Sequence, residues 1–467
     1  MKKIRYRLKV CQEQHHECAI QERPILPRRV IDMGTGDVSA SVRLIINNNQ
    51  MKGDYTCLSY CWGGSQEVAT TASTLEQFST RLPWDKLPQT IRDAITVTRS
   101  LAIRFLWVDA LCILQDNNDD MSIQIGQMGS IYKNAKVTIA AANSRTVTEG
   151  FLKDRTIPHA YKLPFYLSAG RSGSIWLRTS QYFDNKEVDP LESRGWTLQE
   201  SLLSRRMLYY GSLDLMWKCQ RERFVPVNKT HYLYLEKLRR GLPTSIFNIK
   251  GVKGNDRTSS RSKIWEEVVD TFAGRELTVF EDRLPALAGI ASELQNIWKD
   301  TYLAGMWQSF LIRQLGWQRN DYILEDLPPE PYRSPGWSWA SSRGRILFSS
   351  MVQEDAEFVG CIVIPVDKGS PFGRVESGRL TLRAALKSVR PSLDHRYFGM
   401  DLGPNGRRVV DQNSRLLLLG YGRKGFARCL VITPVGTYMR IGATSMNAVD
   451  AEMWRVPNLK RENVTMI

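Results

Sequence analysis

Between Pro88 and Ala142 the spacing of apolar residues changes three times, and it predicts a helix, a strand, a helix and a strand in turn. Apolar residues recur at helical spacing over Gln89–Ala102, while polar residues fill much of the other face. Phe105–Ile113 is almost unbroken apolar sequence, which is typical of a strand covered on both faces, as in a parallel sheet. A second amphipathic helix is expected over 119–135, and Lys136–Ala142 then returns as a strand. Because parallel strands joined by a helix cross over right-handedly, this stretch predicts a βαβ core of an open α/β sheet.

Two further segments are expected to join this sheet, Leu58–Tyr60 and Met207–Tyr210. The predicted fold is therefore an open, mostly parallel α/β sheet with helices on both faces. In such sheets ligands bind beyond the carboxyl ends of the strands. The segments to examine for function are Asp109–Asp116 and the turn after Ala142.

The pattern divides the chain into four segments. We expect a leader over 1–40, the α/β domain over 41–212, a mainly helical segment over 213–330 and a β-rich region over 331–467. In the last region short strands alternate with turn residues, which favours an antiparallel sheet packed as a sandwich or barrel.

Charge, apolar runs and cysteine content limit the partners and the cellular location that we expect. The formal charge of +16, from 64 basic and 48 acidic residues, favours anionic partners. The excess is scattered, which favours a solvated basic surface over a nucleic-acid face; its short clusters are Lys2–Lys9, Arg205 and Arg206, Lys237–Arg240 and Arg257–Lys263. The amino terminus lacks the apolar stretch of a secretory signal, and no apolar run approaches the roughly 18 residues of a membrane helix. Eight Cys without a disulfide-dense pattern suit a reducing cytosol, so a cytoplasmic protein with no membrane association is expected.

Several enzyme signatures are missing from the sequence. It contains no Walker phosphate loop, no His-Glu-x-x-His and no Gly-x-Ser-x-Gly elbow. With five His in all, a His-based triad is also disfavoured. The remaining chemistry consists of carboxylates, aromatic and polar residues near predicted strand ends: Ser59, Tyr60, Trp62, Asp109, Asp116, Arg194, Trp196 and Glu200.

Two carboxylates stand out among these residues. Asp109 interrupts an apolar strand, and since an unpaired buried carboxylate costs several kcal/mol, it needs a backbone N–H, an Arg or a ligand as partner. Glu200 lies four residues after Trp196, so both share one face of the helix expected after Ser193. Glu200 is either a surface carboxylate favoured by the helix dipole or part of a site, and the neighbouring Trp196 favours the site.

A cluster of metal-ligating residue types lies near the amino terminus: Cys11, His15, His16 and Cys18. Four ligands within eight residues leave little freedom to form a tetrahedron, and structural zinc sites usually draw their ligands from two separated pairs. Ordinary packing of a helix is the alternative, and we predict no metal ligands.

Five ordered segments resemble the fungal heterokaryon-incompatibility (HET) domain family: Tyr55–Gly63, Leu87–Ile95, Leu106–Asp116, Ile131–Ala135 and Arg194–Glu200. Weaker resemblance extends to the leader and beyond the domain, over Cys11–Cys18, Asp282–Ile290, Ala304–Trp307 and Pro335–Ala340. The resemblance implies a fungal cytoplasmic protein that triggers programmed cell death on non-self recognition.

HET domains in turn resemble TIR domains. Leu58–Tyr60 is similar to the first TIR strand, which ends in Ser-Tyr, and Trp107–Asp109 is similar to its Trp-Ile-Asp strand. Trp196–Glu200 keeps the Trp-to-Glu spacing of the third TIR helix, although Thr197 replaces the usual Cys and a long excursion precedes Arg194.

The TIR resemblance implies an NAD-cleaving enzyme in which Glu200 is catalytic, NAD is the substrate and no cofactor is bound. The residues expected to contact the nucleotide are Ser59, Tyr60, Trp62, Asp109, Arg194 and Trp196. The alternative is a non-enzymatic signalling module that assembles with protein partners or with copies of itself, since fold does not fix function.

Overall fold

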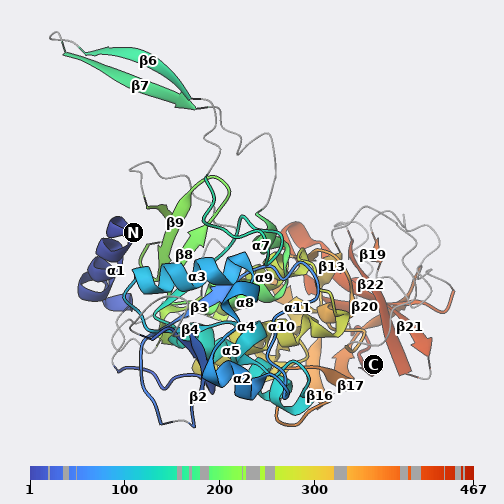
Figure 1. The fold of residues 1–467 in the computed structure, drawn as a ribbon. Coiled ribbons are helices and arrows are strands. Elements are labelled where there is room, and N and C mark those ends of the chain that lie inside the picture. Colours follow the sequence, from blue (N-terminus) through green and yellow to red (C-terminus); the bar gives the residue numbers. More distant parts are fainter. Residues whose placement is uncertain are drawn as a thin grey trace. The chain divides into compact units, whose positions relative to one another are not determined.

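The computed structural model describes residues 1–18, 22–34, 42–48, 50–154, 160–167, 171–178, 189–222, 224–227, 242–247, 258–319, 334–389, 398–400, 412–435, 437–446, 454–455 and 458–467. The chain forms two compact units, Met1–Glu236 and Lys237–Ile467 (Figure 1). The division into four segments that the sequence suggests stays a prediction.

A sheet of eight described strands organises the first unit. In spatial order these are β10 (Val225–Pro226), β9 (Leu215–Cys219), β8 (Arg206–Tyr210), β5 (Val137–Ala140), β3 (Tyr55–Ser59), β4 (Phe105–Trp107), β1 (Arg29–Asp32) and β2 (Arg43–Ile46). The four central strands, β8, β5, β3 and β4, run parallel. The outer strands on both sides are antiparallel, so the sheet is mixed and the expected parallel arrangement holds for its centre.

The helices expected between these strands are present. α3 (Gln89–Ser100) connects β3 to β4, α5 (Asn118–Asn134) connects β4 to β5, and α8 (Trp196–Leu203) precedes β8. The strand order β4-β3-β5-β8 means that the chain reverses its direction across the sheet at β3. The gap between the carboxyl ends of β3 and β5 is therefore a topological switch point, where open α/β sheets bind ligands.

Helices cover both faces of the central strands, as expected. The Thr56 hydroxyl of β3 lies 2.7 Å from that of Thr98 in α3. The neighbouring Tyr55 donates a hydrogen bond of 2.7 Å to the Ile131 carbonyl oxygen of α5. Since successive side chains of a strand point to opposite faces, α3 and α5 lie on opposite sides of the sheet. Burial on both faces explains the continuously apolar sequence of these strands.

The predicted strand over Phe105–Ile113 is wrong beyond its third residue. β4 ends at Trp107, and Asp109–Cys112 forms a short helix, α4, closed by a hydrogen bond of 2.7 Å from the Cys112 N–H to the Val108 carbonyl oxygen. A short buried apolar run has no periodicity that separates a strand from a buried helical turn. Asp109 is consequently the first residue of a helical turn rather than a polar break inside a strand.

Two features of the first unit concern its core. Helix α1 (Lys2–Gln14) belongs to this unit, because Ile4 and Leu8 are buried in the same core as the sheet. Arg205 and Arg206, counted above with the solvated basic surface, are buried. The other described elements of the unit are η1 (His16–Cys18), α2 (Leu75–Thr80), η2 (Trp84–Lys86), β6 (Ala160–Leu167), β7 (Arg171–Arg178) and α7 (Pro190–Ser193).

The second unit combines helices with a sheet of nine described strands, as the β-rich expectation for the carboxyl-terminal region requires. Its pairs are antiparallel except for one parallel contact between β22 and β23. The sheet contains β15 (Gln353–Glu354), β16 (Glu357–Pro365), β17 (Val375–Ala384), β18 (Leu386–Ser388), β19 (Phe398–Met400), β20 (Arg415–Tyr421), β21 (Ala427–Val435), β22 (Thr437–Met446) and β23 (Glu462–Met466).

The rest of the second unit is helical or forms short strand pairs. Its helices are α9 (Thr258–Ala273), α10 (Pro285–Trp298) and α11 (Leu311–Gln314), with single turns at η3 (Thr244–Phe247), η4 (Phe280–Arg283), η5 (Gln308–Phe310), η6 (Trp339–Ser341) and η8 (Arg423–Gly425). The short pairs are β11 (Tyr302–Leu303) with β12 (Met306–Trp307), and β13 (Trp317–Arg319) with β14 (Ile346–Phe348). Across the parts of the chain that the structure describes, none of the helices combines the length and the apolar character needed to cross a membrane.

Candidate functional site

The two loops that leave β3 and β5 meet at the switch point. Gly63 follows Trp62 with a φ of +73°, and a Cβ atom there would lie 2.5 Å from the Thr146 side chain. The Val147 N–H, in the loop after β5, donates a hydrogen bond of 3.2 Å to the Trp62 carbonyl oxygen. Glycine is therefore required at position 63 both by the backbone conformation and by the close approach of the second loop.

Asp109 lies at this edge of the sheet with both carboxylate oxygens paired to protein groups. Trp62 Nε1 donates to Oδ2 at 2.9 Å, and the Ala110 N–H donates to Oδ1 at 2.7 Å. Burial raises the pKa of Asp109, while hydrogen bonds from the Trp62 and Tyr60 side chains and the Arg194 charge act in the opposite direction. These contacts support structural pairing for Asp109 and fix the orientation of the Trp62 ring.

Glu200, in α8, is buried at the same edge. Its residue exposure is 6%, so the alternative of a surface carboxylate is wrong. Burial raises the pKa of its carboxyl from 4.5 to about 7. The charge of Asp109 also raises this pKa, and the groups that act against the increase are the Ser59 hydroxyl, the Arg194 cation and the Tyr132 hydroxyl.

Two buried polar atoms at this edge have unused hydrogen-bonding capacity. Glu200 Oε2 and Ser59 Oγ are both buried, and neither forms a hydrogen bond of normal geometry with any described residue. The nearby Tyr132 hydroxyl is already engaged, since it donates to the Leu58 carbonyl oxygen at 3.0 Å. Buried polar atoms in proteins are nearly always hydrogen-bonded, so this pair is suited to contact a polar ligand.

Arg194 supplies the positive charge of the group. Its Nη1 donates a hydrogen bond to the Tyr60 carbonyl oxygen, at the end of β3. The same cation lowers the pKa of both Glu200 and Asp109. A partly exposed guanidinium beside two carboxyl groups could exchange part of these interactions for a phosphate.

The structure does not bring every candidate into this group. Trp196 is partly buried against the hydrophobic core, and no described hydrogen bond or ring contact joins it to Glu200. Asp116 instead accepts hydrogen bonds of 3.0 Å at both oxygens from the Ala72 N–H, which is a structural role. Tyr132 also belongs to the group around Glu200, and the sequence analysis missed it because its position in the apolar stripe of α5 indicated core packing. Its hydroxyl group was the feature that could have revealed it.

A separate group of described residues could hold a metal ion. Cys11, His15, Cys18 and Cys219 are all buried, and their ligand atoms lie within 4.8 Å of one another. His16, which the sequence analysis considered with them, is exposed and lies outside the group.

The fold and this edge define a class: a doubly wound α/β domain with a buried carboxylate at the switch point of its central strands. The family model described as "Heterokaryon incompatibility protein (HET)" matches residues 55–200, from the first residue of β3 to Glu200. The chain therefore carries a HET domain over these residues, as the sequence motifs indicated. No curated protein matches the chain, and no solved structure does.

Proposed function

We propose that this HET-domain protein triggers cell death in the fungal cytoplasm after non-self recognition, by cleaving NAD at the Glu200 edge of the sheet. The observation that carries the proposal is the Glu200 carboxyl group, which is buried at the switch point with a pKa of about 7 and has one oxygen without a hydrogen bond of normal geometry. The buried Ser59 hydroxyl and the Arg194 cation beside Glu200 support a ligand that is both polar and anionic.

The chemistry is hydrolysis of the bond between nicotinamide and ribose. The bond electrons leave with the neutral nicotinamide ring, water adds to the ribose carbon, and one proton is released with ADP-ribose. The ribose passes through an oxocarbenium-like state, which a carboxylate stabilises electrostatically. In our proposal Glu200 contacts the ribose hydroxyls, Ser59 donates to one of them, Arg194 binds the diphosphate, and the Trp62 ring stacks on a base.

The pKa of Glu200 suits a site that is completed by a cationic substrate. About half of the carboxyl groups are protonated near pH 7, which limits the cost of burying the charge in the free protein. The positively charged nicotinamide ring of NAD would favour the ionised form when it binds nearby.

The test is nicotinamide release from NAD by the concentrated full-length protein. Glu200→Gln keeps the size of the side chain and removes its charge, and we expect a loss of roughly 10²–10³ in rate, as for other single electrostatic contacts in active sites. Glu13→Gln, at an exposed position of α1, is the matched control and should retain the parent rate. Equal rates for the Glu200 variant and the parent protein, or no release by the parent, would refute NAD cleavage at this site.

A second candidate function is assembly without catalysis, supported by the hairpin of β6 and β7. Neither outer edge of this two-stranded sheet is paired with another described strand. One face carries Tyr161, Leu163 and Phe165, with exposures of 61%, 43% and 41%. Unpaired edges and exposed apolar faces recruit strands from other chains, here a second copy of this one. Leu163→Ser with Phe165→Ser should then abolish oligomers in light scattering and killing in cells, whereas Glu200→Gln should leave both intact.

A further inference from the structure

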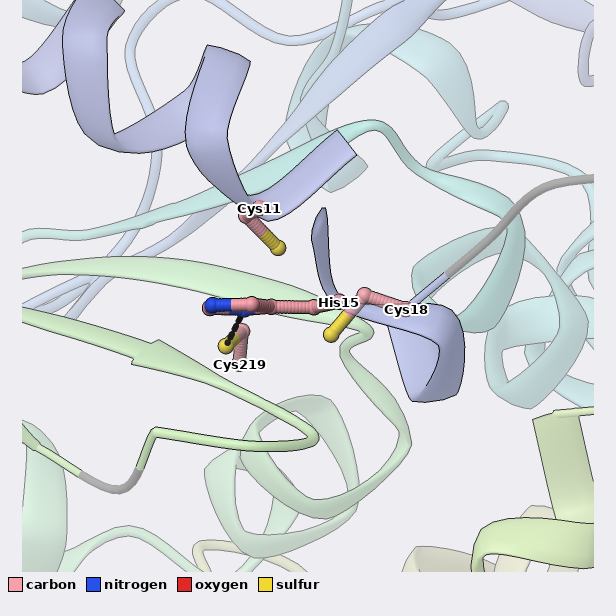
Figure 2. A group of neighbouring side chains, drawn as sticks. All are labelled: Cys11, His15, Cys18 and Cys219. Atoms are coloured by element: carbon pink, nitrogen blue, oxygen red, sulfur yellow. Dashed lines mark hydrogen bonds between the residues drawn. The ribbon is translucent and has the colours of Figure 1, made fainter. Parts of the chain in front are cut away.

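Four side chains from two parts of the first unit that are far apart in the sequence converge on one point. Figure 2 shows Cys11, His15, Cys18 and Cys219 directed toward a common centre. Cys11 and His15 lie one turn apart at the end of α1, Cys18 follows in η1, and Cys219 ends β9. All four are buried, and none of the three cysteines is in a disulfide.

The spacing of the four ligand atoms fits a tetrahedral metal. His15 Nδ1 lies 3.4 Å from Cys219 Sγ, and all four atoms lie within 4.8 Å of one another. With zinc bonds of about 2.3 Å to sulfur and 2.0–2.1 Å to nitrogen, the edges of a regular tetrahedron are roughly 3.5–3.8 Å. Shifts of well under the length of a bond would therefore bring these atoms to zinc-binding geometry.

We propose that Cys11, His15, Cys18 and Cys219 bind one structural zinc ion. Three sulfurs and one imidazole in a tetrahedron favour zinc among the common metals. The protein supplies all four ligands from a buried position, which leaves no open coordination site for catalysis. The crowding that argued against a site within residues 11–18 is relieved, since the fourth ligand is Cys219 at the end of β9 rather than a neighbour in the leader.

The surroundings of the four ligands carry the complementary charge. Zinc with three thiolates and a neutral imidazole has a net charge of −1. The buried guanidinium of Arg206 lies against it, with Nε donating to Cys11 Sγ at 3.2 Å and Nη2 donating to the Cys18 carbonyl oxygen at 2.6 Å. No described carboxylate forms an ion pair with Arg206, and a buried cation without a counter-charge costs several kcal/mol. The zinc–thiolate group provides that counter-charge.

Backbone contacts also prepare Cys219 as a ligand. The Glu222 N–H donates to Cys219 Sγ at 3.2 Å, and the Cys219 N–H donates to the Glu222 carbonyl oxygen at 2.6 Å. This tight turn after β9 fixes the direction of the sulfur, as outer-shell hydrogen bonds do in metal sites.

The proposed ion would hold α1 against the amino edge of the central strands. Arg206 begins β8 and also donates to the Lys136 carbonyl oxygen just before β5, so the cluster lies at the edge opposite Ser59 and Glu200. The zinc site is therefore independent of the proposed NAD chemistry. Its role is to attach the leader helix to the domain.

Metal analysis of the full-length protein, purified from zinc-replete cells without chelators, tests the proposal. We expect about one zinc per chain, since the structure offers one such site. Cobalt-substituted protein should show thiolate-to-cobalt charge transfer and the intense d–d bands of a tetrahedral ion. Absence of zinc with no tetrahedral cobalt spectrum overturns the proposal, and so does a Cys11–Cys18 disulfide in fresh protein. One equivalent of iron in place of zinc overturns the assignment of the metal.

Paired variants locate the ion. His15→Ala should lose most of the zinc, whereas the neighbouring His16→Ala should retain it, and equal losses would contradict the site. Cys219→Ser should lose zinc, while Cys361→Ser, at a partly buried cysteine of β16, should not. Cys219→His preserves four ligands and should retain zinc. If Cys219→Ser does not fold, the metal content and cobalt spectrum of the parent protein still decide the question.

Discussion

Replacing Glu200 by Gln should stabilise the first unit at alkaline pH. The folded protein holds the pKa of this carboxyl at about 7, while the ordinary value is 4.5. Since each pKa unit corresponds to ~1.4 kcal/mol, ionised Glu200 lowers the free energy of unfolding by ~3 kcal/mol. Gln cannot ionise and avoids this cost.

The pH dependence of this stability difference follows from the binding of a proton to Glu200 in the folded and the unfolded chain. Below pH 4.5 both the folded and the unfolded chain carry the proton, so the parent protein and the Glu200→Gln variant should differ little in stability. Between pH 4.5 and about 7 the folded chain alone keeps the proton, so the stability of the parent protein falls as pH rises. Above pH 7 the free energy of unfolding of Glu200→Gln should exceed that of the parent protein by the full ~3 kcal/mol.

Thermal unfolding of the parent protein and Glu200→Gln at pH 4.5 and pH 8.5 measures this effect. For a unit of this size ~3 kcal/mol corresponds to a rise of about 6–12 °C in Tm at pH 8.5, with little change at the lower pH. Glu13→Gln, which changes an exposed carboxylate, should show no such pH dependence. A Glu200→Gln protein that is less stable than the parent at pH 8.5 would show instead that ionised Glu200 stabilises the folded unit through an ion pair.

Four further outcomes are expected. If ionised Glu200 is the active form, the rate of NAD cleavage should rise through about pH 7 and then level off, as a pH–rate profile would show. Trp62→Phe removes the donor to Asp109 Oδ2 and should cost ~1–3 kcal/mol in urea unfolding, because a buried acceptor loses its partner. Gly63→Ala should lower the Tm more than Gly173→Ala, because a Cβ at position 63 would clash with Thr146 at a positive φ, whereas a Cβ at position 173 meets open space. Arg206→Gln should weaken zinc binding about 10–100-fold in competition with a chelator, as changes beside metal ligands commonly do.

The sequence was sufficient for the central strands and the helices between them, since their periodicity is strong. α3 and α5 begin and end within two residues of the predicted limits. The prediction of a strand over Phe105–Ile113 failed, because an apolar run of that length is compatible with a buried helical turn as well as with a strand. The antiparallel direction of the outer strands could not be predicted, because strand direction depends on pairings between segments far apart in the chain.

The candidate site was partly accessible from the sequence. Ser59, Asp109, Arg194 and Glu200 were found from motifs, and their grouping at the switch point is what the structure adds. The burial of Glu200 could not be derived locally, because α8 is only eight residues long and carries no clear polar face. Cys219 gave no signal at all, since nothing near it in the sequence indicates a partner in the leader helix.

The central claim is that this protein acts through the carboxylate of Glu200. The most direct measurement is the NAD content and survival of fungal cells that express the parent protein, Glu200→Gln or Glu13→Gln at equal levels. We expect the parent protein and Glu13→Gln to deplete NAD before the cells die, and Glu200→Gln to accumulate as folded protein without depletion or death. Death of the cells expressing Glu200→Gln, with NAD unchanged, would contradict killing by NAD cleavage at Glu200 and favour assembly through the β6–β7 hairpin.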